Sequence, residues 1–137
     1  MTDNDNLNPA VEVSAAIILH RDKVLLTLRP KDKRLGGFWE FPGGKIEEGE
    51  TPQFALKREL REELDIEIVV GSLLETVYHS YKWGNVRLLA YMCTWQSGKI
   101  KHLEVADHRW VAPANLLDYD ILVADQPIIK KLQKQVT

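Results

Sequence analysis

A chain of 137 residues with 45% hydrophobic content can bury the core of one domain, which we expect at residues 10–137, behind a disordered polar tail at residues 1–9. The net charge of −2, with both signs interspersed, argues against a nucleic-acid-binding surface, and no apolar run approaches the ~18 residues that span a bilayer. With a single cysteine, Cys93, no internal disulfide can form, which fits a reducing compartment. We expect a cytoplasmic protein that is a monomer or a homodimer.

The first third of the chain is predicted to form strands. The β-rich segments 11–20 and 24–28 are separated by a short polar turn and are typical of a hairpin. A third, short strand at 38–41 leads into Pro42-Gly43-Gly44, where the absence of a Cβ lets backbone groups approach a ligand.

A helix is predicted to begin at Thr51, because threonine caps helix N-termini and Pro52 fits the first helical position. The helix should end near Leu64. Leucines at four-residue steps form one apolar stripe, and a stripe of glutamates lies beside it: Leu56, Leu60 and Leu64, then Glu59, Glu62 and Glu63.

The second half of the chain is predicted to contain a long hairpin that turns at Gly84-Asn85. Its strands are expected at 69–81 and 86–95, followed by a strand at 108–111, a helical turn at 113–117 and a final helix at 127–135. Strands interrupted by one helix and closed by another predict an α/β fold with a mixed sheet between helices.

The glutamate stripe suggests a metal site. Carboxylates spaced i, i+3 and i+4 on a helix repel one another, and a hard divalent cation such as Mg²⁺ relieves that repulsion. The alternative is a solvated charged face, because Lys57, Arg58 and Arg61 lie on the same helix.

A longer pattern favours the metal site. Gly44 is followed after five residues by Glu50, and after seven more by Arg58-Glu59-x-x-Glu62-Glu63. This pattern resembles the signature of the Nudix hydrolases, enzymes that cut a nucleoside diphosphate linked to another group, and it implies their α/β/α sandwich. Where that family usually has glycine, this chain has Asp65, which we expect to adopt a left-handed conformation at a cost of about 1 kcal/mol.

The resemblance implies roles for the motif residues. It makes Glu59 and Glu63 the principal ligands of Mg²⁺, for which Mn²⁺ can substitute, with Glu62 assisting. The supporting roles are the carbonyl of Gly43 as a further metal ligand, Arg58 orienting the carboxylates, and Gly44 and Glu50 holding the motif.

The segment 38–45 is similar to the MutT-like branch, which includes the CTP pyrophosphohydrolase type. That resemblance implies hydrolysis of a nucleoside triphosphate to monophosphate and pyrophosphate, removing modified nucleotides from the pool. It places Arg29 and Lys45 on the phosphates and Glu40 near the base. Glu104 would join the metal cluster or act as general base, although a surface glutamate is the alternative.

Asp125 is open to two interpretations. It precedes Pro127 at a predicted helix start and so suits an N-cap, whereas the resemblance makes it the reader of a cytosine or 8-oxoguanine base. For Tyr78, Tyr81 and Trp83, core filling is preferred over stacking on a base. Two alternative functions stay open, an ADP-ribose or nucleotide-sugar hydrolase and a non-catalytic nucleotide-binding module.

Overall fold

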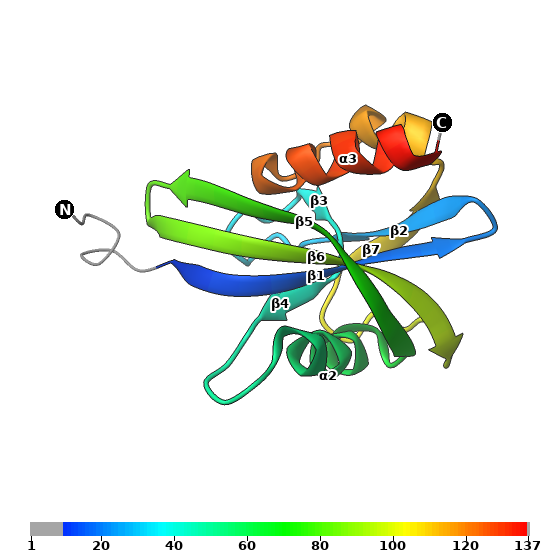
Figure 1. The fold of residues 1–137 in the computed structure, drawn as a ribbon, viewed down its shortest axis with the longest axis horizontal. Helices are drawn as coiled ribbons and strands as arrows, with labels where there is room; N and C mark the ends of the chain where they lie inside the picture. Colours follow the sequence, from blue (N-terminus) through cyan, green and yellow to red (C-terminus); the bar gives the residue numbers. More distant parts are fainter. Residues whose placement is uncertain (1–9, 137) are drawn as a thin grey trace.

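A mixed β-sheet lies between two helices in the computed structural model, which describes residues 10–136 (Figure 1). The predicted tail at residues 1–9 lies outside that range. The strands are β1 (Val11–His20), β2 (Lys23–Leu28), β3 (Trp39–Glu40), β4 (Gly43–Lys45), β5 (Glu67–Tyr81), β6 (Gly84–Ser97) and β7 (Asp107–Val111). The helices are α2 (Pro52–Leu64) and α3 (Gln126–Val136), with 3₁₀ turns at Pro113–Asp118 and Val123–Asp125.

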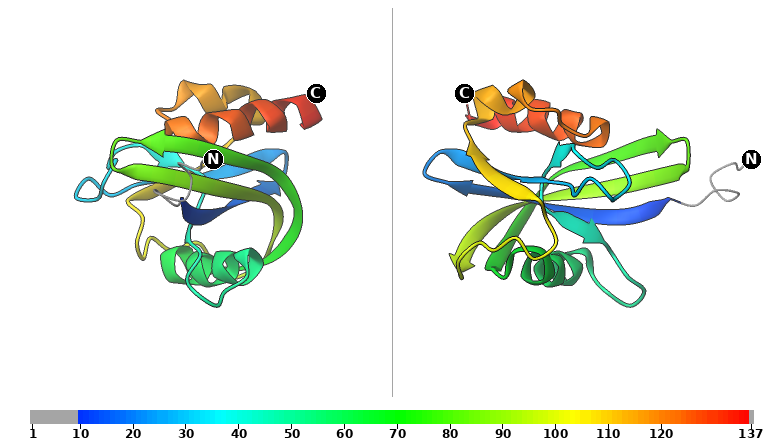
Figure 2. Two further views of the ribbon diagram at one scale, coloured as in Figure 1. Left: turned by 60° about the vertical axis from the view of Figure 1, so that its left-hand side comes forward. Right: turned by 180° about the vertical axis from the view of Figure 1, so that it is seen from behind.

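The seven-stranded sheet has the order β3-β2-β1-β6-β5, with β4 also pairing with β1 and β7 with β2. The central pair β1 and β6 is parallel, and the remaining pairs are antiparallel. Figure 2 shows the strong twist of the long strands β5 and β6, which cross from one end of the molecule to the other. The predicted mixed sheet is therefore confirmed.

Each face of the sheet is covered by one helix, α3 above and α2 below in Figure 1. Because successive side chains of a strand point to opposite faces, β1 feeds two cores. Ile17 packs in the core that contains Ile128 of α3, and Ile18 in the core that contains Leu60 of α2. A central strand buried on both sides holds its neighbours in a fixed register, and β4 is one of them.

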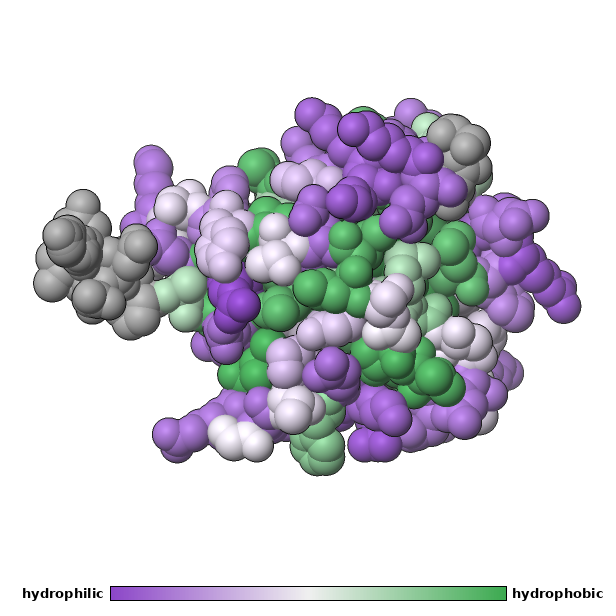
Figure 3. Space-filling model, viewed as in Figure 1, coloured by the Kyte–Doolittle hydropathy of each residue, from purple (hydrophilic) through white to green (hydrophobic). Residues whose placement is uncertain are grey.

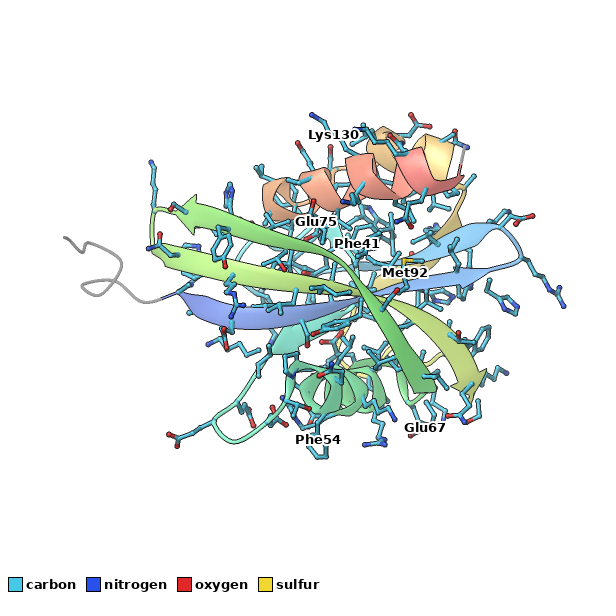
Figure 4. The ribbon with its side chains drawn as sticks, viewed as in Figure 1. Phe41, Phe54, Glu67, Glu75, Met92 and Lys130 are labelled. Atoms are coloured by element: carbon cyan, nitrogen blue, oxygen red, sulfur yellow. The ribbon has the colours of Figure 1, made fainter. Side chains whose placement is uncertain are left out.

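The outward sides of the two helices carry polar or isolated apolar side chains. Phe54 of α2, 57% exposed, and Lys130 of α3 both point away from the sheet (Figure 4). Figure 3 shows hydrophilic residues over both helices and a hydrophobic band between them, across β5 and β6. No helix within residues 10–136 is long and apolar enough to cross a membrane.

The predicted ends of α2 are confirmed. The Thr51 hydroxyl accepts a hydrogen bond from the Phe54 amide at 3.1 Å, and Pro52 occupies the first turn. Asp65 ends the helix with φ 59° and ψ 39°, a left-handed conformation, and its amide donates to the carbonyl of Arg61. An aspartate thus fills a position that glycine adopts more cheaply.

Two details differ from the prediction. The hairpin turns at residues 82–83, because Gly84 and Asn85 already pair with Tyr81 and Ser80. The glycine segment before α2 is not a loop but strand β4. A Cβ on Gly43 would lie 2.0 Å from the Ser14 carbonyl oxygen, so glycine is what lets β4 approach β1.

Candidate active site

Arg58, half-buried on α2, organises the carboxylates around it. Its guanidinium donates to both carboxylate oxygens of Glu50, at 2.7 and 3.0 Å, and to Glu59 and Glu62 at 3.2 and 3.1 Å. Nη2, one of the two nitrogens that donate to Glu50, also donates to the backbone carbonyl of Lys45 at 3.1 Å, which ties α2 to β4. The hydrogen bond that Arg58 donates to Glu50 raises the pKa of Arg58, which keeps the guanidinium charged, and the same contact lowers the pKa of Glu50. These contacts are the kind that an arginine orienting carboxylates would make, and that role stays a prediction.

Glu59 and Glu63 form the buried end of the carboxylate stripe. Burial raises the pKa of Glu59, and burial together with the charges of Glu40, Glu59 and Glu104 raises that of Glu63 well above its usual value. Two coupled carboxylates on adjacent turns of one helix therefore hold their full charge poorly without a cation. A solvated charged face does not describe them.

Gly44 leaves room for the Glu59 side chain. A Cβ at this position would lie 2.3 Å from the Glu59 carboxyl carbon and 2.4 Å from one of its oxygens. Gly44 of β4 therefore packs directly against the Glu59 carboxylate of α2. This close contact fixes the position of the two Glu59 carboxylate oxygens relative to the Gly44 backbone.

Glu104 lies on the loop between β6 and β7, which docks on the end of α2. The amides of Leu103 and Glu104 donate to the Glu63 carbonyl at 3.0 and 3.3 Å. The Glu104 charge is close enough to raise the pKa of Glu63, although its side chain is exposed. The loop therefore places the Glu104 charge within electrostatic reach of Glu63, and its role as a ligand or base stays a prediction.

These residues fit a hard divalent cation. Mg²⁺ takes oxygen ligands and uses a few carboxylates with water and substrate phosphate. Glu59, Glu63 and Glu104 supply carboxylate oxygens, and their mutual repulsion is relieved by a bound cation. Glu62 is half-exposed and its carboxylate is held by Arg58, so it lies at the rim of the cluster.

A cavity of about 680 Å³ opens beside the cluster. It is lined by the N-terminal parts of β1 and β6, the end of β5 with the turn after it, the segment from Arg29 to β4, and the turn before α3. The predicted residues that line it are Arg29, Glu40, Gly43, Gly44, Lys45 and Asp125. Residues that are separated by about a hundred positions in the chain thus share one pocket.

Arg29 and Glu40 form an ion pair in this pocket. The guanidinium donates to both Glu40 oxygens at 3.2 and 3.1 Å, and its Nε donates to the Arg34 carbonyl. Burial raises the pKa of Glu40 to about 7 in spite of Arg29. Lys45 is exposed, and within residues 10–136 its ammonium forms no ion pair, so it is available to an anionic ligand.

Asp125 is buried, with 4% of its surface exposed. Its Oδ2 accepts a hydrogen bond at 3.0 Å from the amide of Phe41, which follows β3, and it caps no helix amide in the described chain. The N-cap interpretation is therefore wrong. Burial, with the charge of Glu40, raises its pKa to about 8, so at neutral pH the carboxyl is largely protonated and can donate as well as accept.

An aromatic stack stands at the cavity mouth. Tyr81 and Trp83 are parallel, with an interplanar angle of 6° and ring centroids 5.1 Å apart, and the Arg34 guanidinium lies 4.3 Å from the Trp83 centroid. Trp83 is 44% exposed and Tyr78 is 72% exposed, so the expectation that both fill the core is wrong. Tyr81 and Trp83 line the cavity, and Tyr78 lies outside it beside Arg87.

The comparison with family models places this arrangement. The NUDIX domain family matches residues 14–131, which contain the carboxylate cluster and all but two of the residues that line the cavity. The chain belongs to the NUDIX domain family. Its Nudix motif therefore spans β4, the loop after it and α2, where the structure shows Arg58 and the carboxylates in contact.

Named relatives cover most of this Nudix domain. A CTP pyrophosphohydrolase of Escherichia coli is 37% identical over 120 residues, which are 88% of this chain and 89% of the relative. An 8-oxo-dGTP diphosphatase of Proteus vulgaris is 40% identical over 85 residues, 61% of this chain and 76% of the relative. The solution structure of the E. coli ORF135 protein superposes with a TM-score of 0.82 at 34% identity, covering 94% of this chain and 92% of the other.

Some residues of the Nudix pocket were not predicted. Lys33 and Arg34 line the cavity, and Trp83 reaches it from the β5–β6 turn. The run of cations between Arg29 and Arg34, just before the glycine motif, is the signal that could have indicated the first two. The sequence offers the Trp83 ring as a possible base-stacking group, but its place at the cavity depends on where the hairpin turns.

Proposed function

We propose that this chain is a Mg²⁺-dependent nucleoside triphosphate pyrophosphohydrolase that acts on modified nucleotides in the cytoplasm, releasing a nucleoside monophosphate and pyrophosphate. The observation that supports it most is that Gly44, which lines a cavity large enough for a nucleoside, lies directly against the Glu59 carboxylate of α2. The relatives named CTP pyrophosphohydrolase and 8-oxo-dGTP diphosphatase suggest CTP or 8-oxo-dGTP as the substrate type, and we include 5-substituted cytosine nucleotides among the candidates.

Glu59, Glu63 and the Gly43 carbonyl would hold the metal, with Glu104 completing the set. When bound, Mg²⁺ supplies countercharge for the phosphates and lowers the pKa of water. Arg58 keeps the carboxylates in place through its hydrogen bonds to Glu50 and Glu59.

The other side chains position the nucleotide. Lys45 and Arg29 lie on the cavity wall and would contact phosphate oxygens, Arg29 by exchanging its Glu40 partner for a phosphate. Glu59 or Glu104 would accept the proton of the attacking water. Attack of water at the β-phosphorus breaks the bond between that phosphorus and the oxygen that bridges it to the α-phosphorus. The bridging oxygen leaves on the monophosphate, and the pyrophosphate retains the oxygen of the attacking water.

The base would lie near Asp125, in the inner part of the cavity. A protonated Asp125 offers a donor and an acceptor, whereas the ionised form only accepts. Both 8-oxoguanine and cytosine carry neighbouring donor and acceptor atoms. The geometry of one carboxyl is compatible with either base, so substrate competition must decide.

The test is pyrophosphate release with Mg²⁺ across dCTP, 5-methyl-dCTP, 8-oxo-dGTP, dGTP and ADP-ribose, read by product chromatography. Preference for a cytosine nucleotide or for 8-oxo-dGTP supports the proposal and names the base. Cleavage of ADP-ribose alone favours the nucleotide-sugar alternative. No turnover of any compound, with binding retained, favours the non-catalytic module.

A matched pair of variants ties turnover to the cluster. Glu63→Gln should lower kcat by at least 100-fold without unfolding the protein, because Gln keeps the shape but removes a negative ligand. Glu48→Gln is the control, since Glu48 is an exposed glutamate in the preceding loop. Equal activity of the two variants would refute the assigned site.

A further inference from the structure

A second group of ligating side chains lies outside the carboxylate cluster. His102 comes from the loop between β6 and β7, and Asp107 and His108 open β7. The Nε2 atom of His102 is 2.7 Å from the Nδ1 atom of His108, and one ligand atom from each of the three residues lies within 4.8 Å of the others. We propose that His102, Asp107 and His108 form a second metal site, for a nitrogen-preferring divalent ion such as Zn²⁺.

The donor set distinguishes this site from the first. Two imidazoles and one carboxylate are ligands that Zn²⁺ and its neighbours in the transition series prefer, whereas Mg²⁺ prefers oxygen ligands alone. Three protein ligands leave a fourth tetrahedral position for water. Burial and the nearby His102 lower the pKa of His108, so its ring is in the neutral, ligating form at neutral pH.

Two adjustments would bring the ligand atoms to tetrahedral spacing: the two rings must separate, and Asp107 Oδ1 must approach His102 Nε2 from its present 4.0 Å. Tetrahedral Zn²⁺ with bonds of about 2.0–2.1 Å holds its nitrogens about 3.3 Å apart, so the two rings must separate by about 0.6 Å from their present hydrogen-bond distance. The His102 side chain is 39% exposed and can rotate by that amount. For both facing nitrogens to ligate an ion, the ring that now donates the shared hydrogen would carry it on its other nitrogen, so two metal–nitrogen bonds would replace the hydrogen bond with no net loss of a proton.

The carboxylate is already held in place. Asp107 Oδ1 lies 4.0 Å from His102 Nε2 and accepts the His108 amide at 2.8 Å. Its other oxygen accepts from Arg109 at 2.6 Å. A ligating carboxylate that is hydrogen-bonded in this way keeps a fixed orientation.

The site would anchor the loop that carries Glu104. On one side, the loop amides of Leu103 and Glu104 donate to the Glu63 carbonyl. On the other, the Ala106 amide donates to the Leu28 carbonyl of β2. An ion shared between His102 and His108 would cross-link the loop to β7 and restrict Glu104. Metal binding itself does not depend on the proposed function, but an effect on turnover does.

The test follows the histidine rings by ¹H–¹⁵N NMR as Zn²⁺ alone is added, without nucleotide and with Mg²⁺ present. The His102 and His108 ring signals should shift together up to one equivalent, while those of His20 and His79 stay unchanged. Hydrogen exchange at the Leu103 and Glu104 amides should slow several-fold. If the His102 and His108 signals do not respond, the site is refuted.

A variant pair separates this site from zinc binding at the glutamates. His102→Gln should weaken Zn²⁺ binding by at least 10-fold and abolish the slowed exchange, while His20→Gln should bind as the parent does. The His102 side chain is partly exposed, so the His102→Gln variant should fold, and its amide NMR spectrum will verify this. Undiminished Zn²⁺ affinity in that variant would overturn the proposal, even with the catalytic activity intact.

Discussion

Replacing Asp125 with asparagine should stabilise the protein relative to the parent, and this advantage should grow as the pH rises. The side chain is buried, and its pKa is raised to about 8 from an ordinary value of 3.8. Below pH 4 the carboxyl is protonated in both the folded and the unfolded chain and costs nothing. Above pH 4 the unfolded chain ionises while the fold holds the group neutral, so the parent loses stability until the pH passes about 8.

The size of the effect follows from that interval. Each pH unit between the two pKa values corresponds to about 1.4 kcal/mol, so the interval from 3.8 to about 8 sets an upper limit of about 6 kcal/mol. Asparagine retains an oxygen that can accept the Phe41 amide and does not titrate. Any cost of its buried NH₂ group is independent of pH. The decisive quantity is therefore how the difference in free energy of unfolding between the variant and the parent changes with pH.

The assay is urea unfolding followed by tryptophan fluorescence at pH 5, 6, 7 and 8, for the parent and Asp125→Asn. The variant's free energy of unfolding should gain on the parent's by about 1 kcal/mol per pH unit. Asp118→Asn, at an exposed aspartate, should show a constant difference. If Asp125→Asn also tracks the parent in parallel, the carboxyl is not held neutral by burial and the reasoning fails.

Three further substitutions probe the Nudix motif. Gly44→Ala places a Cβ 2.3 Å from the Glu59 carboxyl carbon, so kcat and Mg²⁺ affinity measured by titration should fall at least 10-fold; unchanged values would disprove the contact. Arg58→Lys cannot reproduce the forked hydrogen bonds, and steady-state kinetics should show a kcat loss of about 10–100-fold with circular dichroism preserved. Asp65→Gly relieves a left-handed aspartate but loses an exposed ion pair with Lys101. The free energy of unfolding measured in urea should therefore change by less than about 1 kcal/mol, and turnover should not change.

The fold could be predicted where local chemistry decides it. Thr51-Pro52 and the leucine steps defined α2 from end to end, because capping and periodicity act within one turn. The position of the long hairpin's turn could not be predicted in this way. Glycine and asparagine favour turns, but pairing along the whole length of β5 and β6 sets the register and places the turn at residues 82–83.

The site could be predicted only in part for the same reason. The motif carboxylates share one helix, so their spacing already brings them together. Asp125 and Phe41 are far apart in the chain, and their hydrogen bond depends on how the segment before α3 packs against β3. Sequence spacing suggested a helix cap for Asp125, and the tertiary contact replaced it.

The carboxylate cluster beside the cavity is acidic, although the proposed ligand is an anion. Glu40 is close enough to raise the pKa values of both Glu63 and Asp125, so repulsion between carboxyls extends from the metal cluster to the base end of the cavity. Arg29 offsets only part of this charge, since the pKa of Glu40 is still raised to about 7 beside it. Lys33, Arg34 and Lys45 on the cavity wall attract a triphosphate, but the carboxylate cluster should repel it until a divalent cation is bound, because the cation satisfies both partners. Nucleotide affinity measured by calorimetry with a non-hydrolysable analogue should therefore rise at least 10-fold on adding Mg²⁺, and equal affinity in its absence would contradict this account.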